Sequence, residues 1–148
     1  MFEKILVVCV GNICRSPTAE RLLKQTLPQK DISSAGIAVQ RSGLTGKSAD
    51  KMAQEISLAH GVSVEGHQAR QLTPALCQQH DLILVMEKGH IDAVAQIAPE
   101  ARGKVMLLGH FCSGLEIPDP YRLSREAFEQ AYELMEQSVD AWSKKLSL

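Results

Sequence analysis

Three short runs of apolar residues recur along the chain with helix-like stretches between them, and this alternation constrains the fold more than any other feature. The runs cover residues 5–8, 82–86 and 105–108. They are apolar at consecutive positions, which is typical of parallel strands buried on both faces. The sequence therefore predicts one α/β domain of three layers, with a four-stranded parallel sheet covered by helices on both faces.

The remaining elements follow from capping residues and apolar periodicity. Ser16 is expected to cap the first helix with Pro17 at its first position, and Gly61 to end the second helix. In the last helix, a stripe of apolar residues at steps of three and four is expected to belong to the core. The expected strands cover residues 3–9, 32–35, 81–86 and 105–108, and the helices cover 17–27, 48–60, 89–97 and 124–146, with a short helix opening at 73–74 and a loop at 36–47.

Length and charge limit the classes of protein to which the chain can belong. Its 148 residues suit a single domain over residues 1–148, and 16 basic against 17 acidic residues give a net charge of −1. Such a balance gives no general attraction to nucleic acid or anionic membrane. No apolar run approaches the roughly 18 residues of a membrane helix, and the first residues lack the features of a signal peptide. A cytoplasmic protein without membrane insertion is expected.

The four cysteines, at positions 9, 14, 77 and 112, form no Cys-x-x-Cys pair. Neither a zinc ribbon nor a secreted disulfide framework is indicated. Cys77 and His80 lie at helical spacing and could be half of a metal site, but no second ligand pair accompanies them. Packing is therefore expected for Cys77 and Cys112, and no metal or other cofactor is predicted.

The segment Cys9-Val10-Gly11-Asn12-Ile13-Cys14-Arg15-Ser16, here called the anion loop, lies between the first strand and the first helix. Gly11 and Asn12 can adopt backbone angles that turn successive N–H groups inward, and the helix N-terminus adds positive potential. Cys9 is expected to be a thiolate in that field, and Arg15 offers a planar fork for two phosphoryl oxygens. The alternatives are a cysteine that only packs and an anion site without catalysis.

A carboxylic acid suited to proton transfer follows the fourth strand. Asp119 lies between Pro118 and Pro120, which restrict the backbone so that the carboxyl group is presented by a stiff loop. It is the expected general acid, and Tyr121 is a possible wall for an aromatic substrate. The alternative is a tight turn that caps the last helix.

These residues resemble those of the low molecular weight protein tyrosine phosphatases, and the similarity spans nearly the whole chain. The order is specific, because the nucleophile comes first and the acid last, whereas other tyrosine phosphatases with the same cysteine and arginine spacing place the acid first. The matching residues are 9–17, Ser34-Ala35-Gly36, His67, Ala69-Arg70, 81–87 and Asp119-Pro120-Tyr121.

The resemblance implies a mechanism in two steps. Cys9 attacks phosphorus to form a phosphocysteine while Asp119 protonates the leaving phenolate, and Asp119 then acts as base for the hydrolytic water. Arg15 and the N–H groups of the anion loop stabilise the phosphoryl oxygens. Ser16 is expected to hydrogen-bond the thiolate, and the family places residues matching Ser16, Ser34 and His67 around Asn12. An ordinary imidazole is the alternative for His67.

Of three rival functions, two differ from this one at identifiable positions. An arsenate reductase needs two further cysteines after the third strand, and residues 86–89 and their surroundings contain none. A protein-arginine phosphatase characteristically has threonine where this chain has Ile13, and Ile13 suits the apolar flank of a phosphotyrosine ring. The third rival is a phosphopeptide-binding module without activity.

Residues 42–47 and 116–122 and the last helix resemble the bacterial branch that is paired with membrane tyrosine autokinases controlling capsule or exopolysaccharide export. That branch implies a phosphotyrosine protein substrate, the tyrosine-rich tail of such a kinase. A leucine matching Leu44 lies at the pocket rim there, although this chain has extra residues around 39–42. Cys14 is either a packing residue or a redox partner that forms a reversible disulfide with Cys9.

Overall fold

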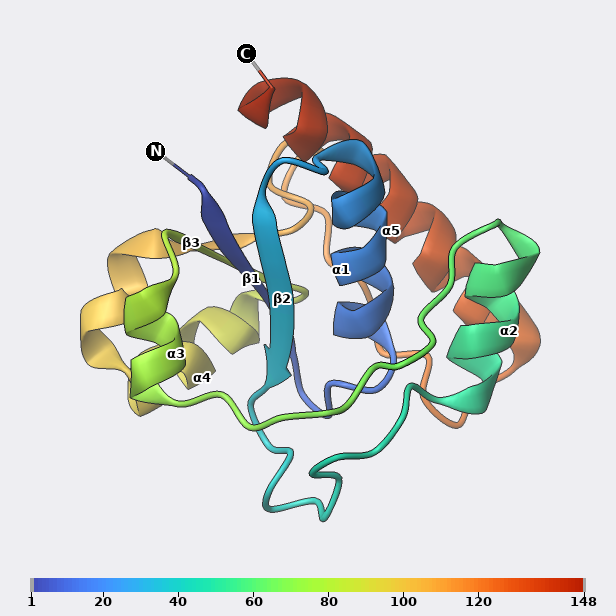
Figure 1. Ribbon diagram of the computed structural model, residues 1–148, viewed down its shortest axis with the longest axis horizontal. Coiled ribbons are helices and arrows are strands. Elements are labelled where there is room, and N and C mark those ends of the chain that lie inside the picture. Colours follow the sequence, from blue (N-terminus) through green and yellow to red (C-terminus); the bar gives the residue numbers. More distant parts are fainter. Residues whose placement is uncertain (1, 148) are drawn as a thin grey trace.

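Four parallel strands form one sheet at the centre of the computed structural model, which describes residues 2–147 (Figure 1). The strands lie in the order β2-β1-β3-β4, and all three pairings are parallel. Their bounds are Lys4–Cys9 for β1, Asp31–Gly36 for β2, Leu82–Val85 for β3 and Val105–Leu107 for β4. The predicted parallel sheet is therefore confirmed, with strand ends that differ by a few residues.

Helices cover both faces of the sheet (Figure 1). On one face lie α1 (Arg15–Thr26), α2 (Lys51–Ala59) and α5 (Arg125–Leu146), and their apolar side chains form one core with alternate residues of β1. On the other face lie α3 (Pro74–Gln79) and α4 (Lys88–Ile97), which form a second core. A 3-10 helix, η1 (Pro99–Lys104), precedes β4 and was not predicted. Three layers result, as the sequence indicates.

The start of α1 differs from its prediction. The helix begins at Arg15 with Cys14 at the N-cap position, so Ser16 is not the cap and Pro17 is not the first helical residue. The Ser16 hydroxyl is instead bonded to groups of the anion loop. Pro17 still lies in the first turn, where a missing N–H leaves no intrahelical bond unmade.

Other helix ends follow their caps. α2 begins at Lys51 and not at residue 48, because the Asp50 carboxylate accepts from the backbone N–H groups of Met52 and Ala53. Thr73 caps α3 ahead of Pro74, as predicted. Ser124 caps α5, whose apolar stripe is buried in the first core, mainly against α1 and α2, apart from Leu146, which is partly buried.

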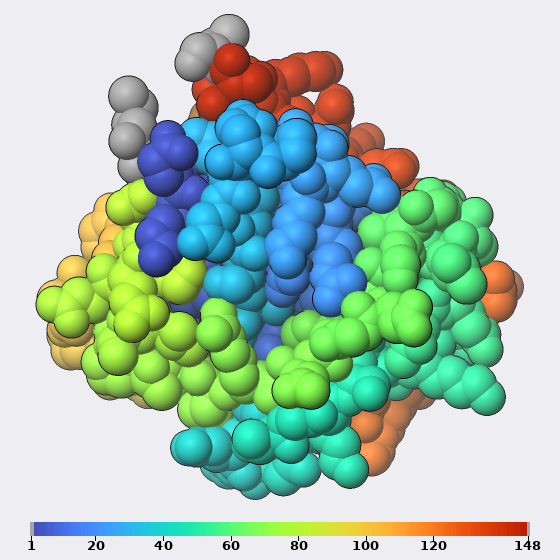
Figure 2. All heavy atoms as spheres, viewed as in Figure 1, coloured from blue at the N-terminus to red at the C-terminus, as the bar shows by residue number. Residues whose placement is uncertain are grey.

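The carboxyl ends of the strands meet at one edge of the sheet, at the bottom of Figure 1. β2 ends there at Gly36, where a Cβ atom would lie 2.5 Å from Val39 Cγ2 and 2.7 Å from the Val10 carbonyl oxygen. No larger residue fits without displacing the anion loop. Figure 2 shows the surface over β2 and α1, where the segment after α2 packs against the lower end of α1. The anion loop is thus held from several sides.

Candidate active site

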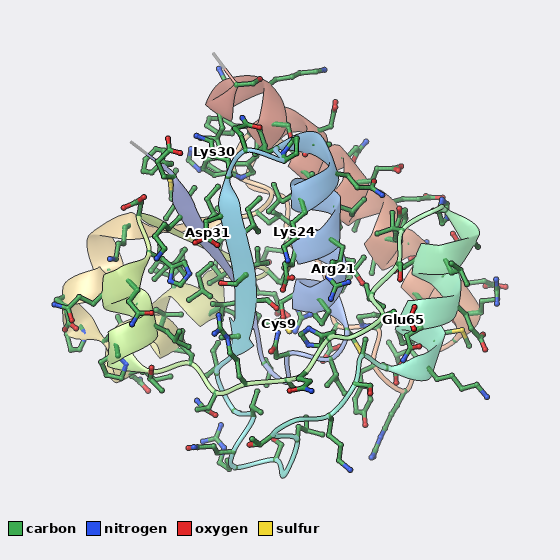
Figure 3. All side chains as sticks on the ribbon, viewed as in Figure 1. Cys9, Arg21, Lys24, Lys30, Asp31 and Glu65 are labelled. Atoms are coloured by element: carbon green, nitrogen blue, oxygen red, sulfur yellow. The ribbon has the colours of Figure 1, made fainter. Side chains whose placement is uncertain are left out.

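Cys9 is the last residue of β1, and Figure 3 shows it at the carboxyl edge of the sheet near the start of α1. Its buried sulfur accepts a hydrogen bond from the Asn12 backbone N–H at 3.2 Å and lies 3.0 Å from Ser16 Oγ. Asn12 has φ 56°, the left-handed conformation that the sequence predicts. The loop therefore curls around the sulfur.

Gly11 serves the loop in a different way from the one predicted. Its φ lies outside the left-handed region, so the expectation of unusual backbone angles is wrong for this residue. A Cβ atom at Gly11 would lie 3.1 Å from Leu44 Cδ1. A side chain at Gly11 would therefore have to displace the end of the rim residue Leu44 by a few tenths of an ångström.

The side chain of Asn12 is saturated with hydrogen bonds. Its Nδ2 donates to Ser16 Oγ at 2.7 Å and to Ser34 Oγ at 3.0 Å, and its Oδ1 accepts from the Arg70 backbone N–H at 3.0 Å. His67 Nε2 donates to the Asn12 carbonyl oxygen at 2.6 Å. Burial lowers the pKa of His67, so the neutral ring supplies this donor. The structure thus places Ser16, Ser34 and His67 around Asn12.

A buried carboxylate, Glu20 on α1, completes this network and was missed from the sequence. Ser34 Oγ donates to Glu20 Oε1 at 2.6 Å, and Lys24 Nζ lies 2.9 Å from the other carboxylate oxygen. Burial raises the pKa of Glu20, but hydrogen bonds from Ser34 and Lys24 outweigh it and the net pKa is lowered. Figure 3 shows Lys24 and Arg21 on the same side of α1. A signal for Glu20 was its charge within an otherwise inward-facing stretch of that helix.

The ionised carboxylate settles the direction of the hydroxyl groups. Because it only accepts, the Ser34 hydrogen points to Glu20, and the Ser34 lone pair faces the Asn12 amide. Ser16 Oγ likewise accepts from Asn12, which leaves its own hydrogen for the Cys9 sulfur. The Ser16 hydroxyl can therefore donate to a thiolate.

Arg15 is 2% exposed, and its Nη1 is held by two groups that do not line the pocket, Glu87 and Ile117. Its Nη1 donates to Glu87 Oε2 at 2.5 Å and to the Ile117 carbonyl oxygen at 2.9 Å, and its Nη2 lies 3.8 Å from Asp119 Oδ2. Glu87 lies two residues after β3, and this position at the carboxyl edge was the available signal for a role that sequence reasoning did not assign. The Nε–Nη2 edge of Arg15 remains for an anion.

His90, the third residue of α4, bonds Glu87 at the start of that helix. The Glu87 backbone N–H donates to His90 Nδ1 at 3.3 Å, and His90 Nε2 lies 3.8 Å from Glu87 Oε2. Burial, and next the charge of Arg15, lower the pKa of His90. A neutral ring with its hydrogen on Nε2 fits both contacts.

A pocket of about 350 Å³ opens over the Cys9 sulfur. Asp119 lies at its wall, and its Oδ1 accepts from the Tyr121 N–H at 3.0 Å in a turn. The alternative that this turn caps the last helix is wrong, because Ser124 caps α5. Leu44 and Tyr121 line the pocket as the sequence predicts, and Ser42 and Arg122 line it without having been predicted. The lining residues are Cys9, Val10, Gly11, Ile13, Cys14, Arg15, Ser42, Leu44, Asp119, Tyr121 and Arg122.

The other cysteines do not gather around a metal. All four cysteines are free thiols. Burial, and next the charges of Asp50 and Cys9, raise the pKa of the Cys14 thiol. Cys77 is buried in the second core, and His80 hydrogen-bonds the Leu76 carbonyl oxygen at 2.7 Å. Among residues 2–147, no three potential ligands lie together as a metal site, and no helix is long and apolar enough to cross a membrane.

Comparison with known proteins matches residues 4–148 to the family of low molecular weight phosphotyrosine protein phosphatases. The low molecular weight protein-tyrosine-phosphatase Wzb of Salmonella typhimurium is 56% identical over 147 residues, which cover 99% of this chain and 96% of the relative.

Solved structures agree with this match. Vibrio vulnificus Wzb in complex with benzylphosphonate has 60% identity and a TM-score of 0.97, over 98% of this chain and 99% of that one. The YwlE arginine phosphatase from Geobacillus stearothermophilus has 32% identity and a TM-score of 0.87, over 97% and 92%. The chain therefore belongs to the low molecular weight phosphotyrosine protein phosphatase family and is a protein-tyrosine phosphatase.

Proposed function

We propose that this phosphatase hydrolyses protein phosphotyrosine through a phosphocysteine intermediate. The observation that carries the proposal is the convergence of Cys9, Arg15 and Asp119 on one pocket. The Cys9 thiolate attacks phosphorus, the bond to the tyrosine oxygen breaks, and Asp119 gives its proton to the leaving oxygen. Asp119 then takes a proton from water, which attacks the phosphocysteine and releases phosphate together with the Cys9 thiolate.

The loop supplies the electrostatic part of the reaction. Arg15 offers its free edge to two phosphoryl oxygens, and the backbone N–H groups of residues 10–16 bind the others beside the N-terminus of α1. Because Asn12 and Arg15 are already held by neighbouring groups, these donors need little reorganisation as charge develops.

The pocket walls favour a phosphorylated aromatic ring. Val10, Ile13, Leu44 and Tyr121 give it apolar sides, and a relative is known in complex with benzylphosphonate, which pairs a ring with a phosphonate. A protein-arginine phosphatase is the second candidate, because the YwlE arginine phosphatase shares the fold. The lower identity to that protein and Ile13 both favour phosphotyrosine.

The physiological substrate in this proposal is the phosphorylated tyrosine tail of a bacterial membrane autokinase that controls capsule or exopolysaccharide production. Similarity to the Wzb, AmsI and Etp phosphatases supports this branch of the family. A cytoplasmic location fits the four free thiols, since reducing compartments keep cysteines unpaired.

Hydrolysis of matched peptides tests the function. Phosphate release is measured from one peptide carrying phosphotyrosine and one carrying phosphoarginine, with wild type and Cys9→Ser. We expect release from the phosphotyrosine peptide only, and none by Cys9→Ser although the variant still binds phosphate. Turnover by Cys9→Ser would exclude the phosphocysteine, and preference for phosphoarginine would exclude the substrate class.

The kinase is tested separately. The host's autophosphorylated tyrosine kinase is incubated with the phosphatase, and loss of phosphotyrosine is followed by immunoblot. We expect complete dephosphorylation by wild type and none by Cys9→Ser. A kinase that keeps its phosphotyrosine while the peptide is hydrolysed would exclude this partner but not the activity.

A further inference from the structure

Exposed apolar side chains concentrate beside the catalytic pocket. Among residues 2–147, the large apolar side chains that are exposed are Val10, Leu58, Phe111, Tyr121 and Leu123. Two of them line the pocket, and Leu123, which is 61% exposed, lies two residues beyond Tyr121. Exposed apolar side chains that cluster around a cavity are typical of a binding site.

A second hollow of about 450 Å³, here called the flanking groove, lies next to the catalytic pocket. Tyr121 and Arg122 line both, so these two residues form the wall between the two hollows. The Arg122 guanidinium carbon lies 5.2 Å from the centre of the Tyr121 ring, and the Leu123 N–H donates to the Pro120 carbonyl oxygen at 2.9 Å. The flanking groove is lined by Asp50, Lys51, Met52, Glu55, Tyr121, Arg122, Leu123 and Phe128.

The acidic groups of the flanking groove already have partners. Asp50 caps α2 through its carboxylate, and Glu55 Oε2 lies 3.8 Å from Arg125 Nη1. The apolar part of the lining comes from Met52, Leu123 and Phe128, and it lies beside the cationic Lys51 and Arg122. The groove therefore offers an apolar side chain a surface to pack against.

We propose that the flanking groove binds an apolar or aromatic side chain two positions away from the phosphotyrosine in a peptide substrate. The proposal rests on the function proposed above. In an extended peptide, side chains two residues apart lie on the same face, about 6.5 to 7 Å from one another, whereas immediate neighbours point away. That spacing lets one side chain enter the catalytic pocket and the other pass over the wall formed by Tyr121.

The test compares three phosphotyrosine peptides that differ only in one residue: all glycine around the phosphotyrosine, leucine at position −2, or leucine at position +2. kcat/KM is measured for each, with 4-nitrophenyl phosphate as a reference that carries no flanking residue. We expect one of the two leucine peptides to be preferred over the glycine peptide by about 10-fold, as one well-placed apolar side chain allows.

Variants tie the preference to the groove. Leu123→Ser removes an exposed side chain and so leaves the folded core intact, and Met52→Gln is a second variant. Both should reduce the preference to about 2-fold, a loss of roughly 1 kcal/mol. Leu58→Ser, which removes a leucine that is 69% exposed farther along α2, is the matched control and should keep the preference.

Two results would contradict the proposed role of the flanking groove: equal kcat/KM for the three peptides, or a preference that survives in both groove variants. In either case hydrolysis of the glycine peptide and of 4-nitrophenyl phosphate would continue. Failure of the proposed function differs, because wild type would then hydrolyse no phosphotyrosine peptide at all.

Discussion

Replacing Glu20 by glutamine tests whether a carboxylate remote from the substrate sets the state of the nucleophile. The variant keeps the size of the side chain but gives Ser34 a partner that can also donate, and it places an amide beside Lys24, which lies 2.9 Å from the native carboxylate. The Ser34 hydroxyl can then turn its hydrogen toward the Asn12 amide group, so that two donors face each other. The Asn12 side chain would move away, and its hydrogen bond to Ser16 would weaken.

The magnitude follows from one hydrogen bond. A bond to a charged group stabilises it by about 1.5 to 3 kcal/mol net, and the bond from Ser16 to Cys9 is of this kind. Weakening it by about half removes about 1 kcal/mol from the thiolate. Alkylation of Cys9 at a fixed pH should then slow by about 5-fold, since 1.4 kcal/mol corresponds to a factor of ten.

The rate of alkylation of Cys9 by iodoacetamide at a fixed pH, measured by mass spectrometry of the peptide that contains it, reads this loss without turnover. Ser34→Ala should slow alkylation as well, and Lys24→Gln, which keeps the bond between Glu20 and Ser34, should leave the rate near that of wild type. If Glu20→Gln is alkylated as fast as wild type while Ser34→Ala is slower, the carboxylate does not orient the hydroxyl groups and the reasoning fails.

Stability gives Glu20→Gln a second readout. Because the folded pKa of Glu20 is lowered from its ordinary 4.5, its ionised form stabilises the fold above that value, and the contribution is lost as pH falls through the folded pKa. We expect the variant to be less stable at pH 7 by about 1 to 2 kcal/mol in urea unfolding. The difference should narrow below pH 4.5, and a difference that stays constant to acid pH would contradict the ionised carboxylate.

Three further predictions concern other parts of the site. For Asp119→Asn, kcat should fall by about 10²-fold to 10⁴-fold with phenyl phosphate. It should fall much less with 4-nitrophenyl phosphate, because the 4-nitrophenolate can leave without a proton; equal losses would argue against Asp119 as the general acid. For Glu87→Gln, which weakens the hold on Arg15, kcat/KM should fall about 10-fold or more and the inhibition constant of inorganic phosphate should rise; an unchanged inhibition constant would show that Arg15 keeps its place without the carboxylate. For Cys14→Ser, inactivation by peroxide should become irreversible, whereas wild type should recover with dithiothreitol if Cys14 protects Cys9 as a disulfide; recovery of the variant would leave Cys14 as a packing residue.

The sequence predicts the sheet and the anion loop well because both depend on neighbours in the chain. The buried strand around residues 5–8 and the left-handed Asn12 are local in this sense. The capping role of Ser16 fails because its hydroxyl finds better partners in the loop. The left-handed backbone predicted for Gly11 is not found. The feature that distinguishes this position is the close approach of Leu44, which only the fold creates. Local signals cannot contain such contacts.

Glu87 and Glu20 were not assigned a role from the sequence for the same reason: each bonds a residue that is distant in the chain. Glu87 meets Arg15 across 72 residues of sequence, and Glu20 meets Ser34 across strand and helix. Both lie behind groups that face the pocket, and neither lines it. No pattern of spacing marks such a residue, although a charged residue at the end of a central strand or within an inward-facing helical stretch is a reason to look for one.

A site for a phosphate dianion would be expected to exclude negative charge, yet two carboxylates hold this one together. Each is neutralised where it lies: Glu87 by Arg15, and Glu20 by Lys24 with Arg21 close by. The two carboxylates therefore act on the pocket by orienting its donors. Glu87 fixes the guanidinium edge of Arg15, and Glu20 directs the Ser16 hydroxyl hydrogen to the Cys9 sulfur. Donors fixed in advance are worth more in a transition state than mobile ones, because they do not reorganise as charge develops. It follows that neutral substitutions of the two carboxylates should lower kcat/KM even though they remove negative charge from the neighbourhood of an anion site, the opposite of what net charge alone predicts.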